Sequence, residues 1–149
     1  MEREGLLRVL APCGLDCGKC LAFRGGEIQR HAEGLRCGLG DTFAAYAERF
    51  SGMRPEFGGY EAFRALLDVF AAGSCGGCRA SGCLFTACGV TVCVRERGVD
   101  FCFQCAEFPC DHHGMPEQLA ERWHINNRRM AESGPGAFFE RIKDKPRYP

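Results

Sequence analysis

The stretch CGLDCGKC, residues 13–20, places three cysteines within eight positions. Its spacing, C-x3-C-x2-C, is compatible with an iron–sulfur cluster, a zinc site or disulfide bonds. Nine further cysteines follow, so that twelve of the 149 residues carry a thiol. This density is typical of small proteins that disulfides or metal ions hold together. Whether these thiols bind metal or form disulfides therefore determines how the cysteine-rich part of the chain is stabilised.

Outward from this stretch, cysteines recur in pairs separated by two residues. The pairs are CGKC (17–20), CGGC (75–78) and CFQC (102–105). Two intervening residues let both sulfurs turn toward one ion, and glycines let backbone N–H groups approach the thiolates. A C-x-x-C pair also serves thioredoxin-like redox chemistry, but that motif opens a helix in a βαβ pattern, which this sequence lacks. Three pairs in one chain therefore indicate metal binding, and zinc is the expected metal.

Ten cysteines are the expected metal ligands, and a closed structural zinc site needs four. The ten are Cys13, Cys17, Cys20, Cys75, Cys78, Cys88, Cys93, Cys102, Cys105 and Cys110. We expect the pair at 75 and 78 to share an ion with Cys88 and Cys93. The other six would build a second site with two thiols left over, and a three-site arrangement that uses all twelve thiols stays open.

Cys37 and Cys83 are the least expected ligands, because a lone cysteine in a helical region usually packs as a small apolar residue. Of the adjacent His112 and His113, at most one could join a site near Cys110, since their rings diverge. Neither the sharing of ions nor the number of sites follows from the spacing.

Two metal-dependent alternatives to structural zinc remain. The C-x3-C-x2-C spacing occurs in radical S-adenosylmethionine enzymes, but a full (β/α)8 barrel takes about 250 residues and helices follow Cys20 here. The bacterial ferredoxin run C-x2-C-x2-C-x3-C-P is absent. An iron–sulfur or thiol redox protein is the first alternative, and an enzyme with an open cysteine-ligated metal position is the second. No P-loop, G-x-S-x-G, H-E-x-x-H or G-x-G-x-x-G motif points to an enzyme.

The sequence shows no secretory signal and no run of about 18 apolar residues. We therefore expect a cytosolic protein with reduced thiols, without a membrane partner, which disfavours disulfides. Lys and Arg number 19, as do Asp and Glu, a balance that disfavours nucleic acid as a partner and leaves a protein partner open. Residues 121–149 hold seven basic and four acidic residues, a mild sign of an anionic partner.

The remaining chain predicts a mainly α fold, with a small α+β fold as the variant. We expect a single domain over 1–149, helical over about 26–73 and 115–143, with metal-binding loops over about 13–20 and 74–110. Asp41 is the expected cap of a helix that buries Phe43, Tyr46, Ala47 and Phe50. A second helix from about Tyr60 has the apolar face Phe63, Leu66, Leu67 and Phe70 and stops at Gly73. Packing of these aromatic side chains in a core is the expected role.

The C-terminal region predicts two more helices. One starts near Pro116, ends at Gly134 and buries Leu119, Trp123 and Met130. A short helix after Pro135 uses Ala137, Phe138 and Ile142, and the polar tail KDKPRYP (143–149) is expected to be loose. Residues 74–110 hold eight of the twelve cysteines among glycines, and we expect metal to order them in place of a conventional core.

The ordered motifs resemble a prokaryotic family known as domain of unknown function 3795. They are CGLDCGKCLAF (13–23), CGGCRA (75–80), CVRERGVDFCFQCAEFPC (93–110) and GPGAFFERIK (134–143). The resemblance implies a small cysteine-rich cytosolic protein, presumed to bind zinc, with no assigned activity. All ten expected ligands fall on the family's cysteine positions. Family members commonly have a further cysteine where this chain has Phe85, while Cys83 lies nearby, so the ligand set of the middle site differs here.

Overall fold

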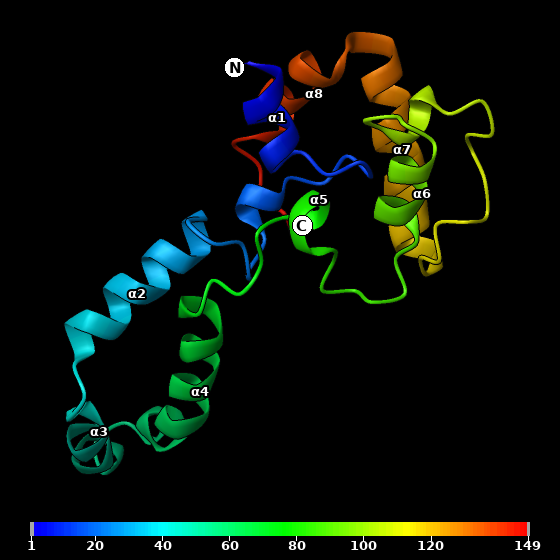
Figure 1. The fold of residues 1–149 in the computed structure, drawn as a ribbon. Coiled ribbons are helices and arrows are strands. Elements are labelled where there is room, and N and C mark those ends of the chain that lie inside the picture. Colours follow the sequence, from blue (N-terminus) through cyan, green and yellow to red (C-terminus); the bar gives the residue numbers. More distant parts are fainter. Residues whose placement is uncertain (1, 149) are drawn as a thin grey trace. The chain divides into compact units, whose positions relative to one another are not determined.

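The structure is a computed structural model that describes residues 2–148. Those residues form eight α-helices, three 3-10 helices and no strand, apart from one isolated antiparallel bridge between Leu10 and Asp16. The elements are α1 (Arg3–Val9), η1 (Cys17–Lys19), α2 (Glu27–Leu39), α3 (Phe43–Ser51), η2 (Pro55–Gly59), α4 (Tyr60–Ala71), α5 (Cys78–Ser81), α6 (Val90–Glu96), η3 (Cys102–Gln104), α7 (Glu117–Ser133) and α8 (Pro135–Ile142). The predicted mainly α fold is confirmed (Figure 1).

The chain divides into two compact units. The helical unit is Leu21–Ser74, and the cysteine unit combines the residues up to Cys20 with those from Cys75 onward. Helices α7 and α8 thus belong with the cysteine-rich loops, whereas the expected division grouped them with residues 26–73. The single domain over 1–149 stays a prediction.

The helical unit is an antiparallel arrangement of α2 and α4, joined through α3 and η2 (Figure 1). Its core is small, with Ala32, Leu67 and Ala71 buried. A polar contact supports one end of the pair, because the Gln29 side chain donates to the Ala71 carbonyl at 3.2 Å. Small residues at the contact let the two helices approach closely.

Two details of the predicted helices differ in the structure. Thr42, not Asp41, is the N-cap of α3, and no side chain caps it. Asp41 instead forms an ion pair with Arg64 at 3.7 Å. In the predicted stripes Ala47 and Leu67 are buried, but Tyr46 and Leu66 are 51% and 53% exposed. Helices of this small unit pack on few neighbours, so they bury a narrower face than the sequence pattern offers.

The core of the cysteine unit comes mainly from the two ends of the chain. Leu6 and Leu10 from the α1 region pack against Met130 of α7, Phe138 of α8 and Phe101. Burying an apolar side chain of this size contributes roughly 1.5–3 kcal/mol. Residues 75–110 add Phe101 to this cluster and bury Val90 and Val94 of α6, so they do form some conventional core, more than was expected.

Helices α7 and α8 begin and end close to where they were predicted. Pro116 directly precedes α7, and Gly134, with φ of +79°, ends α7 and starts α8. Trp123 and Met130 are buried as predicted, but Leu119 is only half-buried and Ala137 is exposed. The predicted stripes on both helices were therefore partly wrong.

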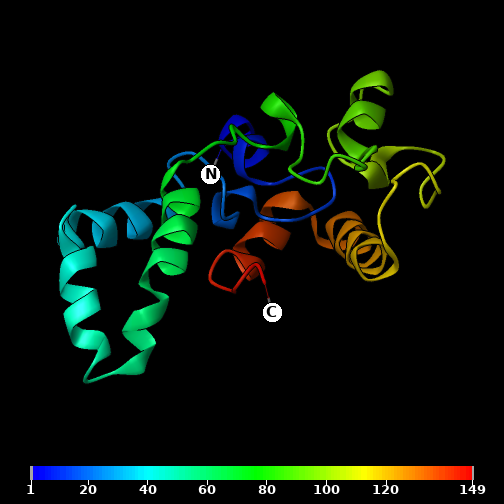
Figure 2. The same ribbon diagram turned by 90° about the horizontal axis from the view of Figure 1, so that it is seen from below.

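The polar tail is held in place through residue 147, contrary to the prediction. Figure 2 shows it in red, curling back after α8. Lys19 Nζ donates to the Lys145 carbonyl at 2.9 Å, Arg122 donates to the Arg147 carbonyl at 3.1 Å, and Arg147 donates to the Asp16 carbonyl at 2.5 Å. Basic side chains and backbone carbonyls thus fasten a segment that has little apolar content. Across residues 2–148, no helix has the length and apolar character needed to cross a bilayer.

Candidate metal centre

Four cysteines from distant parts of the cysteine unit form what we call the first sulfur group: Cys17, Cys78, Cys83 and Cys88. The Sγ atoms of Cys17 and Cys78 lie 3.7 Å apart although 61 positions separate them in sequence. Cys78 also interacts through its side chain with Cys83, and Cys83 interacts in the same way with Cys88. The group therefore joins η1, α5 and the loop that follows α5.

The 3.7 Å separation has a direct chemical meaning. Thiolates that bind zinc lie about 2.3 Å from the ion at tetrahedral angles, which places two ligand sulfurs about 3.8 Å apart. A disulfide would bring the sulfurs to about 2.05 Å. All twelve cysteines are free in the structure. The spacing of Cys17 and Cys78 is close to that of two zinc ligands, and here the two thiols form a hydrogen bond with Cys17 as the donor.

Proton sharing within the first sulfur group pushes neighbouring thiols in opposite directions. The contact with Cys78 lowers the pKa of Cys17 to about 7 and also lowers the pKa of Cys83. The contact with Cys17 is the largest cause that raises the pKa of Cys78. The contact with Cys83 is the largest cause that raises the pKa of Cys88. In the hydrogen bond from Cys17 to Cys78 a proton lies between two sulfurs that would repel each other as thiolates. A divalent cation would replace such protons, and zinc binding accordingly releases them.

The CGGC turn has the local geometry expected for a thiolate site. The Gly77 N–H donates to Cys75 Sγ at 3.3 Å. Gly77 has φ of +104°, a conformation that residues with a side chain rarely adopt, and it directly precedes α5, which starts at Cys78. The turn thus holds the Cys75 sulfur against the backbone and directs Cys78 toward Cys17.

Two arginines compensate charge around the first sulfur group. Arg79 interacts electrostatically with Cys13, Cys17 and Cys78, and its guanidinium donates to the carbonyls of Leu7 and Asp100 at 3.1 and 2.6 Å. The positive charge of Arg147 lowers the pKa values of Cys17 and Cys83. Four thiolates around one zinc ion carry a net charge of about −2, so two partly buried cations suit this donor set.

A second sulfur group consists of Cys93, Cys102, Cys105 and Cys110. Cys93 interacts electrostatically with Cys105 and Cys110, and Cys102 interacts with all three. Burial raises the pKa of Cys102 to about 11 and raises that of Cys93 as well. These residues come from α6, η3 and the loop between η3 and α7, and they again provide four thiols.

A buried indole borders the second sulfur group. Trp123 is 4% exposed, and its Nε1 atom has no hydrogen-bond partner among the described residues. A weak interaction of the indole N–H with Cys102, outside hydrogen-bond geometry, lowers the pKa of that thiol, while burial raises it by more. A buried N–H without an acceptor is costly, and a metal-bound thiolate accepts a hydrogen bond better than a thiol does. The orphaned Trp123 N–H therefore fits a charged sulfur at Cys102.

Close backbone contacts connect the loops that carry the two groups. Gly89 N donates to the His113 carbonyl at 3.1 Å. A Cβ at Gly89 would lie 2.4 Å from the His112 carbonyl oxygen, and one at Gly114 would lie 2.2 Å from the Ala87 carbonyl oxygen. Only glycine permits this approach, which holds the segment after Cys88 against the segment after Cys110.

Asn127, a residue that the sequence analysis missed, connects two cysteine loops through α7. It is fully buried, and its Nδ2 donates to the Pro12 carbonyl at 3.3 Å while its Oδ1 accepts from the Phe103 N–H at 3.0 Å. Pro12 precedes Cys13, and Phe103 follows Cys102. The neighbouring Asn126 donates to the Gly14 carbonyl at 3.1 Å. Side chains of α7 thus hold the loop at Cys13 and the loop at Cys102 in position.

Seven of the ten predicted ligands fall in the two sulfur groups, in a grouping that differs from the expected one, and their ligation of a metal stays a prediction. Cys83, one of the least expected, lies within the first group, and Cys93 lies with the second group rather than with Cys88. Cys13 interacts electrostatically with Cys17 and Cys102 but belongs to neither group. Cys75 Sγ accepts a hydrogen bond from the Gly77 N–H within its own turn. Cys20 accepts from the Tyr148 hydroxyl at 3.8 Å.

The remaining candidates lie away from the sulfur groups or serve other contacts. Cys37 is exposed on α2 in the helical unit, not buried as expected. His113 Nδ1 accepts from the Met115 N–H at 2.9 Å, and its ring lies 4.8 Å from that of Trp123. Across residues 2–148, no three Cys, His, Asp or Glu side chains stand in an arrangement that could hold a metal ion. Side-chain rotation within each group would have to precede four-fold ligation.

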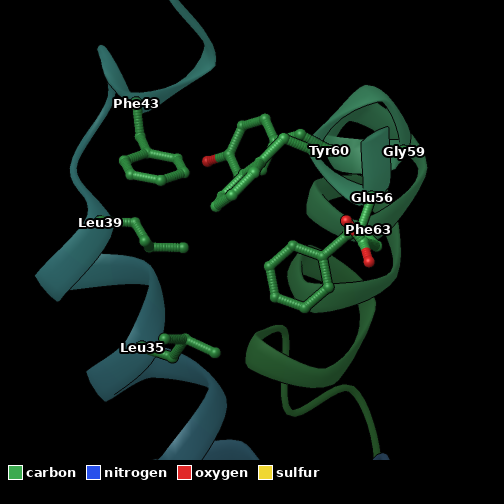
Figure 3. A pocket seen from close by; sticks show the side chains of 8 residues that line it. Leu35, Leu39, Phe43, Glu56, Gly59, Tyr60 and Phe63 are labelled. Atoms are coloured by element: carbon green, nitrogen blue, oxygen red, sulfur yellow. The ribbon is translucent and has the colours of Figure 1, made fainter. Parts of the chain in front are cut away.

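The helical unit contains a separate apolar hollow of about 380 Å³. Figure 3 shows Leu35 and Leu39 of α2 facing Phe63 of α4, with Phe43 and Tyr60 at the other end of the hollow. The rings of Phe43 and Tyr60 lie 5.1 Å apart. Packing of these aromatic side chains into a core was expected, but Phe63 is 43% exposed and lines an open space.

Comparison with protein families gives one result. The family described as "Protein of unknown function (DUF3795)" matches residues 9–115, which include both sulfur groups and all twelve cysteines. The match ends before residues 134–143, to which the resemblance had been extended. Comparisons with curated proteins and with solved structures gave no match. Because the matched residues make up more than half of the chain, this protein belongs to the DUF3795 family.

Proposed function

We propose that this protein binds zinc through its two sulfur groups and acts in the cytosol as an interaction or regulatory module. The observation that carries the proposal is the 3.7 Å separation of the Cys17 and Cys78 sulfurs, which matches the spacing of two zinc ligands. These two residues lie on either side of the helical unit in sequence, so an ion between them would fasten the two parts of the cysteine unit.

The donor sets favour a structural role. Each group offers four cysteines, the number that completes a closed tetrahedral zinc site, whereas a catalytic zinc keeps one position for water. Residues 17, 78, 83 and 88 would hold one ion, and residues 93, 102, 105 and 110 the other. When bound, the metal supplies cross-links between loops, and its binding free energy is then folding free energy.

The loop between Cys83 and Cys88 supports the interaction role. It exposes Leu84 and Phe85, which are 55% and 38% exposed. Both side chains lie between two members of the first sulfur group, so an ion there would fix the loop that presents them. Exposed apolar side chains on an ordered loop suit contact with a protein partner.

The test counts metal sites with a matched pair of variants. Full-length protein is purified without oxygen, stripped of metal and titrated with zinc against a chromophoric chelator. We expect two tight sites in the wild type, one in Cys78→Ser, and two in Cys37→Ser, which removes an exposed thiol of the helical unit. Equal stoichiometry in Cys78→Ser and wild type would refute ligation by Cys78. Iron with inorganic sulfide in the purified protein would favour a cluster instead.

A further inference from the structure

A basic pocket of about 400 Å³ lies in the cysteine unit, beside the loop that carries Cys17. Its walls come from residues 14–19, from α7 and α8, and from the tail at 145–147. Neither the sulfur groups nor the family description accounts for it. The pocket lies within one compact unit, so its walls form a single folded body.

The charge of the pocket is strongly one-sided. Five of the lining residues are basic and one is acidic: Lys19, Arg122, Arg129, Lys145 and Arg147 against Asp16. No salt bridge with a side-chain carboxylate forms at any of the five basic residues within residues 2–148. In the protein as a whole the charges balance. Clustered cations that form no salt bridge concentrate anions in a concave site.

Hydrogen bonds to backbone carbonyls hold three of the five cations in position. Lys19 donates to Lys145, Arg122 to Arg147, and Arg147 to Asp16. The Asp16 carboxylate meanwhile accepts from the Gly18 N–H at 2.8 Å. Each guanidinium has five N–H donors and each of these two spends one on a protein carbonyl, so donors remain for a ligand. Side chains fixed in this way lose little entropy when an anion binds.

The rest of the wall is apolar. Ile125 of α7 and Ile142 of α8 line the pocket, and Ile125 is 39% exposed. The volume lies within the range of 300–1,000 Å³ that is typical of small-molecule sites. A ligand that fits has a compact anionic group for the basic residues and a flat or apolar part for the isoleucines.

We propose that this pocket binds a small phosphorylated molecule of about mononucleotide size. Arginine matches the geometry of phosphate through two parallel N–H bonds, and several cations together suit a dianion better than a single carboxylate. The phosphate contacts Arg122, Arg129 and Lys145, and the remainder of the ligand lies against Ile125 and Ile142. This proposal does not require a bound metal: four of the five basic residues come from α7 and the tail, and only Lys19 comes from the loop that carries Cys17.

The probes are adenosine 5′-monophosphate, ribose 5-phosphate and adenosine, measured by isothermal titration calorimetry on the full chain as purified. We expect both phosphates to bind and adenosine to bind at least about tenfold more weakly, since it lacks the charged group. Arg129→Gln and Lys145→Gln should each raise the Kd of the monophosphate about tenfold or more. Both side chains lie at the exposed edge of the pocket, so the fold does not depend on them.

Arg128→Gln is the matched control, because Arg128 is exposed on the same helix and does not line the pocket. It removes the same charge, so a change in long-range attraction alone would affect it as much as Arg129→Gln. An unchanged Kd in the control, with the losses above, supports the proposal. Equal losses in Arg128→Gln and Arg129→Gln would overturn it. So would the absence of binding by both phosphates at millimolar concentration, or binding of a single-stranded hexanucleotide without binding of the mononucleotide.

Discussion

The substitution Asn127→Ala tests whether α7 positions the two cysteine loops. The Asn127 side chain is fully buried and contacts the backbone on both sides, at Pro12 and at Phe103. Alanine would leave the part-buried Phe103 N–H without an acceptor. The Pro12 carbonyl would keep only a long contact of 3.5 Å with the Cys102 N–H.

The magnitude follows from these contacts. An orphaned buried N–H costs about 1–3 kcal/mol, and the lost bond to Pro12 adds about 0.5–1.5 kcal/mol. Alanine regains about 0.5 kcal/mol through its higher helix propensity. We therefore expect Asn127→Ala to lower the free energy of unfolding by about 1–4 kcal/mol, a sizeable part of the 5–15 kcal/mol that is typical of a folded domain.

Asn126→Ala is the control on the same helix. Asn126 is half-buried and makes one bond, to the Gly14 carbonyl, and the propensity gain is the same, so we expect a loss of about 1 kcal/mol or less. Chemical unfolding followed by tryptophan fluorescence reports on the cysteine unit, since Trp123 lies in α7. If Asn127→Ala costs no more than Asn126→Ala, Asn127 does not connect the loops in the way that the structure indicates.

Three further predictions concern glycines, the indole and the first sulfur group. Gly89→Ala should destabilise the protein by about 2 kcal/mol or more, because its Cβ would meet the His112 carbonyl oxygen. The control Gly38→Ala, in open space on α2, should stabilise the protein by up to about 1 kcal/mol. Thermal unfolding measures both changes, and stability changes of the same sign in the two variants would contradict the contact at Gly89. Trp123→Phe should weaken zinc binding about tenfold or more if the indole N–H donates to a metal-bound Cys102, and an unchanged zinc affinity would exclude that bond. Cys78→Ser should make residues 74–110 sensitive to limited proteolysis while α4 stays protected, and an unchanged digestion pattern would show that this thiol has no structural role.

Local patterns predicted most of the helices. The apolar spacing around Trp123 and Met130, with Pro116 before and Gly134 after, located α7 to within a residue or two. The stripe on α4 was less reliable, because Leu66 and Leu67 lie about 100° apart on the helix and only Leu67 faces α2. How wide a face a helix buries depends on its neighbour, which the local pattern does not contain.

The sulfur groups could not be predicted in detail for a related reason. Cys17 and Cys78 meet across 61 residues, and nothing in the local spacing specifies such a contact. Cys83 was set aside because it stands alone in sequence, yet the turn at Gly82, with φ of +80°, precedes it and the loop brings it to Cys78 and Cys88. Asn127 had a usable signal: it is a polar residue at a position of the α7 stripe between Trp123 and Met130, where burial requires hydrogen-bond partners.

Metal analysis of the full chain, purified without oxygen, combined with X-ray absorption at the zinc edge, shows directly whether the two sulfur groups hold zinc. We expect about two zinc ions per chain and no iron, with four sulfur neighbours at about 2.3 Å. Protein that takes up no zinc after reduction and reconstitution, or zinc bound by oxygen and nitrogen alone, would contradict this expectation.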